Sequence, residues 1–319
     1  MILVTGGAGY IGAHVVRSLR SAGFSPVVVD DLSSGHREFV PDDVPFVELS
    51  VLRTKRLIEE LGQYPIEAVI HLAGFKYAGV SVQQPLHTYQ QNVQGTVSLL
   101  RAMEELGIGH YVFSSSAAVY GTPDVDTVTE ATPTSPESPY GESKLVAEWV
   151  ARGQATATGL RQTSLRYFNV VGSMTPQIHD TSPHNLFPLV IRALGEGHRP
   201  KIFGADYPTP DGTCVRDYVH VGDLADAHVV ATQRLLAGDD LEPVYNLGSG
   251  TGSSVRQIMT EVAHVTGIDF EPLIEARRSG DPARIVASGE LAARDLNWTM
   301  RHSLADMVAS AWEAGAGTR

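Results

Sequence analysis

A tyrosine and a lysine stand four residues apart at Tyr140 and Lys144. On a helix this spacing puts both side chains on one face. A tyrosine at its ordinary pKa of about 10 is a poor base at neutral pH, and lowering that pKa toward 7 takes roughly 4 kcal/mol of preferential stabilisation of the phenolate. A neighbouring ammonium group supplies part of that stabilisation. We therefore predict that Tyr140 is a general base and acid and that Lys144 activates it.

Serine side chains gather where a predicted strand ends. The segment Ser114-Ser115-Ser116-Ala117-Ala118-Val119-Tyr120-Gly121 follows the apolar run that begins at Tyr111. Ligand-facing groups in an open α/β sheet lie at the carboxyl ends of its strands, so we place the Ser116 hydroxyl beside Tyr140. A lone Tyr-x-x-x-Lys is common by chance and often marks a solvated helix face. Its combination with this segment and with a glycine motif near the N-terminus argues against that alternative.

Three glycines, Gly6, Gly9 and Gly12, follow the first predicted strand and open the first predicted helix. Such glycines allow a tight turn whose backbone N–H groups approach a pyrophosphate at the positive helix N-terminus. Asp30 follows at the end of the second predicted strand, where a carboxylate hydrogen-bonds the ribose hydroxyls and repels a 2′-phosphate. With Asp31 adjacent and no arginine close by, the motif predicts NAD rather than NADP. A glycine turn followed by an acidic helix cap is the structural alternative.

The elements that must position these groups follow from apolar periodicity. Helix-period segments include Ile11, Val15 and Leu19 after the glycines and a helix that begins near Tyr140. They alternate with short β-branched runs, which predicts a Rossmann-type, doubly wound parallel sheet in an α/β fold. The predicted strands are Ile2 to Val4, Val27 to Asp30, Phe46 to Leu49, Ala68 to His71, Tyr111 to Ser114 and Thr163 to Tyr167.

The alternation breaks into proline-rich sequence from Gly172 to Tyr218, which predicts a second lobe. The segment from Val219 to Leu247 is predicted to form a helix and then a strand that returns to the main sheet. Ser254 and Gln257 have the spacing of a capping box for a helix toward Thr266, and Ser303 precedes a final helix. We therefore divide the chain into an NAD-binding domain, residues 1–172 plus 219–250, and a smaller C-terminal substrate-binding lobe, residues 173–218 plus 251–319.

Composition excludes several classes of function. The 319 residues carry a net charge of −12 and no basic run, so a nucleic-acid partner is not expected. No apolar stretch reaches the ~18 residues of a membrane helix, and Met1 runs directly into the first strand without a leader pattern. Cys214 is the only cysteine, which favours a reducing cytoplasm and excludes an internal disulfide. We predict no metal site.

The chain resembles the UDP-glucose 4-epimerases of the extended short-chain dehydrogenase/reductase superfamily along nearly its whole length. The segments that carry the resemblance are His71-Leu72-Ala73-Gly74-Phe75-Lys76, Tyr167-Phe168-Asn169, Asn185-Leu186 with Pro188, Gly212-Thr213, Val215-Arg216-Asp217-Tyr218-Val219-His220, Tyr245-Asn246-Leu247-Gly248, and Arg277-Arg278 with Gly280-Asp281.

This resemblance implies two sets of contacts. The implied NAD site comprises Gly6, Gly9, Tyr10, Ile11, Gly12, Asp30, Asp31, Ser34, Gly35, Ser50, Val51, Leu72, Ala73, Gly74, Lys76, Asn92, Tyr140, Lys144 and Phe168. The implied UDP-sugar site comprises Ser116, Asn169, Asn185, Leu186, Lys201, Phe203, Arg216, Tyr218, Arg278, Asp281 and Ile285. The residue types in the implied UDP-sugar site are consistent with this ligand, because arginines suit a pyrophosphate and an aromatic ring suits uracil.

Four positions depart from the common pattern of the family. Ser50 stands where many members carry an aspartate near the adenine, and Ala118 replaces a frequent threonine or serine. Lys201 occupies a position that is usually small, and Val170 replaces a proline. None of the four alters the Tyr140 and Lys144 pair.

The implied reaction interconverts UDP-glucose and UDP-galactose. Tyr140 as phenolate takes the proton of the sugar C4 hydroxyl while the C4 hydride passes to bound NAD, whose positive nicotinamide ring adds to the field of Lys144. The 4-keto sugar rotates and takes the hydride back on its other face.

Sister 4,6-dehydratases and decarboxylases are the alternatives, but dehydratases carry an Asp-Glu pair where this chain has Ala117 and Ala118. A non-catalytic NAD(H) sensor is a further alternative, which the intact Tyr140 and Lys144 disfavour.

Two finer expectations also rest on the resemblance. A homodimer is expected through the helix after Tyr140 and the helix from Thr96 to Leu106, although Leu145 and Trp149 could equally face the sheet. At the position of Ile285, narrow enzymes carry a bulky tyrosine, whereas broad ones carry a smaller residue and also accept N-acetylated sugars. Ile285 is intermediate in volume and stiff at χ1. We therefore expect UDP-glucose and UDP-galactose as the preferred pair, with weaker activity on their N-acetyl analogues.

Overall fold

The main sheet of the computed structural model, which describes residues 1–278 and 282–316, is parallel throughout. Its strand order is β11-β6-β5-β4-β1-β2-β3, so the chain winds outward in both directions from β1. The strands are β1 (Ile2–Thr5), β2 (Pro26–Asp30), β3 (Phe46–Glu48), β4 (Ala68–His71), β5 (His110–Ser114), β6 (Arg161–Tyr167) and β11 (Val244–Leu247). The predicted doubly wound fold is confirmed.

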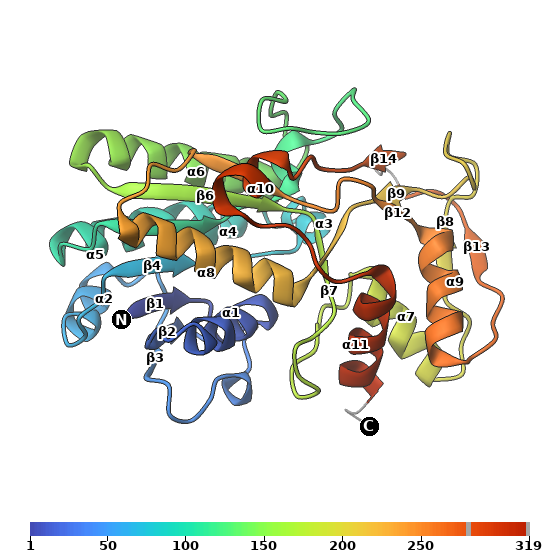
Figure 1. Ribbon diagram of the computed structural model, residues 1–319, viewed down its shortest axis with the longest axis horizontal. Coiled ribbons are helices and arrows are strands. Elements are labelled where there is room, and N and C mark those ends of the chain that lie inside the picture. Colours follow the sequence, from blue (N-terminus) through green and yellow to red (C-terminus); the bar gives the residue numbers. More distant parts are fainter. Residues whose placement is uncertain (279–281, 317–319) are drawn as a thin grey trace.

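Both faces of this sheet are buried, as parallel sheets require. Side chains alternate along β1: Ile2 and Val4 pack with α1 and α8 in one core, while Leu3 packs with α2, α5 and α6 in the other. These layers are visible in Figure 1. The helices of this domain are α1 (Tyr10–Ser21), α2 (Thr54–Leu61), α3 (Ala78–Ser81), α4 (Pro85–Tyr89), α5 (Gly95–Glu105), α6 (Pro139–Thr158) and α8 (Val221–Ala237), with the short turns η1 (Arg37–Phe39), η2 (Gln90–Gln94) and η3 (Ala117–Tyr120).

A second lobe lies beyond the carboxyl ends of the strands, at the right of Figure 1. Helices of this lobe pack together in one core. The helices are α7 (Leu186–Gly195), α9 (Val255–Thr266) and α11 (Leu304–Ala316), and the strands are β8 (Lys201–Phe203), β9 (Val215–Arg216), β12 (Ser253–Ser254), β13 (Leu273–Glu275) and β14 (Arg284–Ile285). These strands form a three-stranded sheet of order β12-β9-β14 and a two-stranded sheet of β13 and β8. A parallel pair, β7 (Asn169–Val171) with β10 (Tyr218–His220), leads from the main sheet to this lobe.

Local sequence signals fix several of these boundaries. The Ser254 hydroxyl accepts from the Gln257 backbone N–H at 3.0 Å and the Gln257 side chain accepts from the Ser254 N–H at 2.8 Å, which confirms the capping box. Helix α9 then ends at Gly267, whose φ of +67° is the left-handed conformation that favours glycine. The predicted return to the main sheet is confirmed by α8 and β11.

The packing near the C-terminus adds detail to the predicted division of the chain. Helix α10 (Glu290–Leu296) and Trp298 bury their side chains in the core of the main sheet, beside α8 and β11. This segment belongs to residues 251–319, which the sequence places in the lobe. The boundaries of the two units otherwise remain a prediction.

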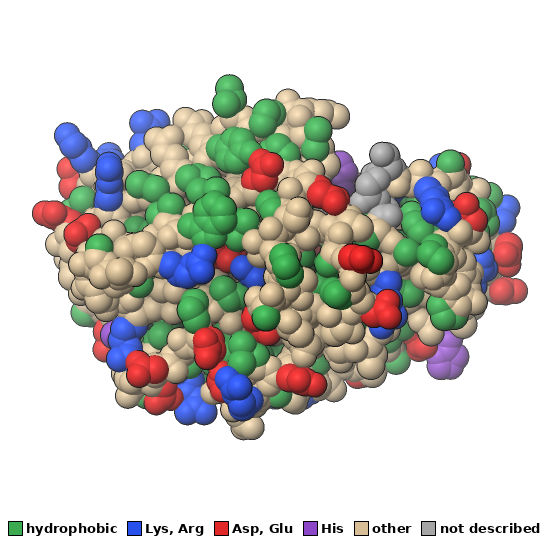
Figure 2. Space-filling view, turned by 90° about the horizontal axis from the view of Figure 1, so that it is seen from above, with side chains coloured by type: hydrophobic (Ala, Val, Ile, Leu, Met, Phe, Trp, Pro, Cys, Tyr) green, Lys and Arg blue, Asp and Glu red, His purple; other side chains and the backbone are tan. Residues whose placement is uncertain are grey.

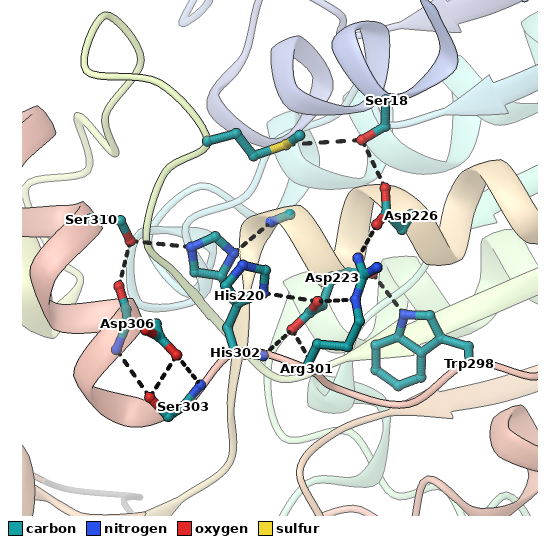
Figure 3. Close-up of polar contacts among 12 residues, drawn as sticks. Ser18, His220, Asp223, Asp226, Trp298, Arg301, His302, Ser303, Asp306 and Ser310 are labelled. Atoms are coloured by element: carbon teal, nitrogen blue, oxygen red, sulfur yellow. Dashed lines mark hydrogen bonds and ion pairs between the residues drawn. The ribbon is translucent and has the colours of Figure 1, made fainter. Parts of the chain in front are cut away.

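A buried carboxylate fastens the C-terminal segment to α8 (Figure 3). Asp223 is fully buried and accepts from the backbone N–H groups of Arg301 at 3.0 Å and His302 at 3.1 Å. Burial opposes its charge, but these hydrogen bonds hold its pKa below the ordinary value. The His302 ring also contacts Asp223 and stacks on His220 with centroids 3.9 Å apart. This cluster holds α11 of the lobe against α8, which packs on the main sheet.

Within the described residues, each helix is either too short or too polar to span a bilayer.

Candidate active site

A cavity of about 1320 Å³ lies between the carboxyl ends of the strands and the lobe. Most residues predicted for the two sites line it: Gly6, Gly9, Tyr10, Ile11, Gly12, Asp30, Asp31, Ser34, Gly35, Val51, Leu72, Ala73, Gly74, Lys76, Ser116, Tyr140, Lys144, Phe168, Asn169, Asn185, Leu186, Lys201, Phe203, Arg216, Tyr218 and Arg278. Ser50, Asn92 and Ile285 are not among its lining residues, and Asp281 lies outside the described residues.

The glycine turn leaves no room for side chains. Gly6 has a φ of +73°, and a Cβ there would lie 2.6 Å from the backbone nitrogen of Ala73. A Cβ on Gly12 would overlap the Gly6 carbonyl oxygen and lie 2.8 Å from the Cα of Gly7. Gly9 caps α1 without a side-chain hydrogen bond to the first helical turn. The exposed N–H groups and the positive end of α1 therefore form a cradle that suits a pyrophosphate.

Asp30 lies at the end of β2 beside this cradle. Its carboxylate accepts from the N–H groups of Ala8 and Leu32, each at 2.9 Å. Burial is the largest influence and raises its pKa, while these two hydrogen bonds act in the opposite direction. A Cβ on Gly35 would lie 2.7 Å from the Asp30 Oδ1, so the Gly35 loop approaches the carboxylate closely. Together with the glycine cradle, this arrangement fits the adenosine diphosphate half of NAD.

Helix α6 carries the tyrosine and the lysine on the face that meets the strand ends. The helix begins cleanly because the Ser138 hydroxyl accepts from the Gly141 N–H at 3.2 Å and Pro139 takes the first helical position. Gly141 is needed there, since a Cβ would lie 2.5 Å from the carbonyl oxygen of Ala118. The start of α6 therefore packs directly against η3, the turn that follows Ser116.

The predicted constellation is assembled around Tyr140. The Lys144 Nζ lies 5.9 Å from the centre of the Tyr140 ring and donates to the Ser114 carbonyl at 2.8 Å. Burial is the main influence on the Tyr140 phenol and raises its pKa, while a hydrogen bond with the Ser116 side chain lowers it. Burial also lowers the pKa of Lys144 to about 8. The side chains on their own keep the phenol protonated at neutral pH, so the expected lowering of the Tyr140 pKa is not produced by Lys144 alone.

Groups for a nucleotide sugar lie on the lobe side of the cavity. The Asn169 amide donates to the Asp217 carbonyl at 2.9 Å, and the Asn185 amide donates to the Asp180 carboxylate at 2.7 Å. Both amides therefore have their nitrogen atoms engaged, which fixes the orientation of each side chain. Cationic side chains are also present in the cavity wall, as a diphosphate requires.

The far end of the cavity is formed by a two-stranded ribbon. Lys201 and Phe203 lie on one face of β8, two residues apart. The Lys201 Nζ pairs with Glu275 of β13 at 2.9 Å, which accounts for the departure at this position: the longer side chain is directed to a partner strand. The Arg278 guanidinium lies 4.0 Å from the centre of the Phe203 ring, so it shares the aromatic face that suits a uracil.

Asn92, Ser50 and Ile285, which were predicted for the two sites, do not line the cavity and contact other parts of the protein. Asn92 is buried; its side chain accepts from the Phe75 N–H at 2.6 Å and donates to the Ser143 hydroxyl at 2.8 Å, so it ties the loop after β4 to α6. Ser50 accepts from the Leu52 N–H at 3.4 Å. Ile285 pairs in register with Arg216 of β9 and packs, partly buried, in a cluster with Phe168.

Several residues of the cavity wall were not predicted from the sequence. Tyr167 and Asp180 line the wall, as do Tyr77 and His184, whose rings meet edge to face with centroids 5.3 Å apart. Tyr167 could have been found, because it lies within a segment that carries the resemblance. The other three sit in loops without a motif, and only the fold brings Tyr77 to His184. Among the described residues, no cluster of three or more His, Cys, Asp or Glu side chains is arranged to hold a metal ion.

Comparison with known proteins gives one consistent result. The model of the NAD dependent epimerase/dehydratase family matches residues 2–248. The UDP-glucose 4-epimerase of Azospirillum brasilense is 42% identical over 98% of this chain and 91% of its own. The structure of UDP-glucose 4-epimerase from Brucella ovis in complex with NAD is similar at 39% identity and a TM-score of 0.94, covering 98% of each chain. The UDP-Glc/GlcNAc 4-epimerase of Campylobacter jejuni is similar at 31% identity and a TM-score of 0.87, covering 99% of each chain.

Proposed function

Since the chain belongs to the NAD dependent epimerase/dehydratase family, we propose that it is an NAD-dependent UDP-sugar 4-epimerase that interconverts UDP-glucose and UDP-galactose. The observation that carries this proposal is the placement of Ser116, Tyr140 and Lys144 at one wall of a cavity. The same cavity has a dinucleotide cradle and, on its lobe side, groups suited to a nucleotide diphosphate. Relatives named as UDP-glucose 4-epimerases cover nearly the whole chain.

The side chains divide the chemistry among them. When bound, NAD supplies reversible hydride acceptance at the sugar C4. Tyr140 removes the proton of the C4 hydroxyl as that carbon is oxidised. It returns the proton after the 4-keto sugar has rotated to present its other face. The Ser116 side chain is hydrogen-bonded to the Tyr140 phenol. It can therefore hold the sugar C4 hydroxyl close to that phenol. Lys144, anchored on the Ser114 carbonyl, places a cation beneath the phenolate. Arg216 and Arg278 retain the diphosphate while the sugar rotates.

The competing 4,6-dehydratase reaction needs an acid and a base at the sugar C5 and C6. The two positions after Ser116 that would carry them are Ala117 and Ala118, both within η3. An alanine methyl cannot transfer a proton, so elimination at C5 and C6 has no agent at this turn.

The proposal is tested by incubating the purified protein with a panel of nucleotide sugars. We expect UDP-galactose to give UDP-glucose without added cofactor, at a rate in the ordinary range for enzymes of about 1–1000 per second. A 4-keto-6-deoxy product would establish a dehydratase instead. Stable binding of NAD with no turnover of any sugar would establish an NAD(H) sensor.

We also propose a cytoplasmic homodimer that pairs through α5 and α6. Leu145 is buried, whereas Trp149 is 51% exposed and so does not face the sheet. Val82 and Leu86 are also exposed, by 62% and 83%, in the segment that packs beside α6. Figure 2 looks onto the side where α6 lies and shows apolar side chains grouped there. Such a surface suits a two-fold interface.

Light scattering tests the dimer. We expect a particle of twice the 34.3 kDa chain mass at micromolar concentration. Trp149→Lys should shift the particle to a single chain, because it places a charge in the centre of the proposed interface. Ile274→Lys is the matched control, since Ile274 is equally exposed at 51% but lies on β13 of the lobe. A wild-type protein that scatters as one chain would contradict the proposal.

Ile285 is proposed to limit the size of the sugar. It pairs with Arg216 and packs in the cluster that contains Phe168, so its side chain supports the cavity wall from behind. We expect kcat/KM for UDP-glucose to exceed that for UDP-N-acetylglucosamine by about 10-fold to 200-fold, the range of steric discrimination. Ile285→Gly should lower that ratio by improving the N-acetyl substrate, while the conservative Ile285→Val should leave it nearly unchanged. An unaltered ratio in Ile285→Gly would make Ile285 ordinary packing.

A further inference from the structure

Directly behind the proposed active site lies a fully buried ion pair that the reaction described above does not use. Glu148 of α6 and Arg166 of β6 are both buried and form two parallel hydrogen bonds. The Arg166 Nε donates to Glu148 Oε1 at 2.9 Å and its Nη2 donates to Oε2 at 2.6 Å. A buried charge pair is costly to desolvate and is rarely a source of net stability. Its presence here therefore calls for a role other than packing.

The pair connects segments that carry site residues. The Ser115 hydroxyl donates to Glu148 at 2.5 Å, and Ser115 directly precedes Ser116. Arg166 directly precedes Tyr167 and Phe168 in the cavity wall, and it donates to the Tyr120 hydroxyl of η3 at 2.9 Å. One carboxylate thus holds α6, the end of β5 and β6 in a single arrangement.

Glu148 is also one helical turn beyond Lys144. Four residues apart on α6, the two side chains lie on the same face. Lys144 is 6% exposed and has the Ser114 carbonyl as a neutral acceptor at 2.8 Å. Burial lowers the pKa of this ammonium, and the negative charge of Glu148 acts against that decrease. The other titratable groups near Lys144 are Tyr140 on its own helix, His71 on β4 and Tyr167 on β6. Burial disfavours a charge on His71 and on Tyr167. The Tyr140 phenol is the same in the wild type and in a Glu148 variant, so a difference between these two proteins reports on Glu148.

We propose that Glu148 is a positioning residue for the reaction: its carboxylate, fixed by Arg166 and Ser115, keeps the Lys144 ammonium charged and holds the Ser115-Ser116 strand end against α6. This role rests on the proposed function, because it acts through Lys144 and Ser116. Neither Glu148 nor Arg166 is among the residues that line the cavity. The expected consequence is a change in the protonation of Lys144 when Glu148 loses its charge.

The chain allows a direct measurement, because Lys55, Lys76, Lys144 and Lys201 are its only lysines. The purified protein, with its bound cofactor, is labelled with [ε-13C]lysine, and each methylene resonance is followed against pH by NMR. Lys144→Met identifies the Lys144 resonance. In Glu148→Gln we expect the Lys144 titration midpoint to fall by about one pH unit, the effect of one nearby opposite charge. Glu148→Asp should largely restore it, and the exposed Glu104→Gln on α5 is the matched control.

The alkaline limb of the kcat profile should move to lower pH with that midpoint, whereas a purely structural defect lowers kcat equally at every pH. If Glu148→Gln does not fold, the double variant Glu148→Gln/Arg166→Met removes the whole ion pair without leaving an unpaired charge. A smaller fall in the same direction is then expected, because the Arg166 charge that repels the Lys144 ammonium is lost together with the nearer Glu148 charge. An unchanged Lys144 midpoint in a folded variant overturns the proposal. The NMR titration needs no turnover, so its failure is distinct from absence of epimerase activity in the wild-type protein.

Discussion

Replacing Tyr140 with phenylalanine is expected to lower kcat for UDP-galactose by at least ~100-fold, the scale of a general acid-base contribution. The change removes one hydroxyl and leaves the partly buried ring in place, so folding and nucleotide binding should be retained. Steady-state kinetics gives kcat, and titration calorimetry with UDP shows whether the diphosphate site is intact.

The matched control is Tyr167→Phe. Tyr167 is a second phenol in the cavity wall, close enough for its charge to interact with that of Tyr140. Burial raises the pKa of Tyr167 as it raises that of Tyr140, but Tyr167 lies on β6 and does not share a helix face with Lys144. We expect Tyr167→Phe to keep most of the turnover. Near wild-type kcat in Tyr140→Phe with a severe loss in Tyr167→Phe would show that the base has been assigned to the wrong tyrosine.

Replacing Gly12 with alanine is expected to weaken NAD binding by at least ~10-fold and so to lower the amount of NAD that the purified protein carries. The added Cβ overlaps the Gly6 carbonyl oxygen and approaches the Cα of Gly7. Both neighbours are backbone of the pyrophosphate cradle, and a penalty of only about 1.4 kcal/mol already weakens binding tenfold. The measurement is the nucleotide released by denaturing the protein, per chain, for the wild type and the variant.

Gly153→Ala provides the control for this substitution. Gly153 lies in α6, and a Cβ there meets nothing within 4 Å, so the variant should keep its NAD and gain slightly in helix stability. Near-stoichiometric NAD in a folded Gly12→Ala protein would contradict the cradle at the start of α1. Recovery of NADP from the wild type would instead contradict the role given to Asp30.

The features that local sequence determines could be predicted. Glycines after a strand, a carboxylate about 20 residues later and a capping box each depend on a few neighbouring residues, and the structure has Gly6, Asp30 and Ser254 in the expected geometry. The parallel sheet was also predictable, because strands buried on both faces are continuously apolar. The closeness of Tyr140 and Lys144 was predictable as well, because a spacing of four residues on one helix puts both side chains on the same face.

Contacts between distant segments could not be predicted. The Glu148 and Arg166 pair joins a helix to a strand, and neither residue type at those positions signals a partner. Periodicity left open whether Trp149 faces the sheet or solvent, and only the packing of α6 shows that it is exposed. Asn92 is a further example: the hydrogen bonds of its side-chain amide to the Phe75 backbone and to the Ser143 hydroxyl join segments that no sequence motif connects.

The role of Lys144 required the three-dimensional environment as well. Sequence spacing predicted a cation beside Tyr140, but not that burial would bring the pKa of Lys144 down to about 8. The charge on this group at neutral pH therefore depends on surrounding residues that the motif does not contain.

We propose that this chain inverts the sugar C4 centre with a cofactor that it already holds. The most direct test follows the purified protein by NMR, without added nucleotide, starting once from UDP-galactose and once from UDP-glucose. We expect both reactions to converge on the same mixture of the two sugars, and Tyr140→Phe to slow both approaches alike. Failure of either sugar to convert, or conversion only when NAD or NADPH is supplied in stoichiometric amounts, would contradict this proposal.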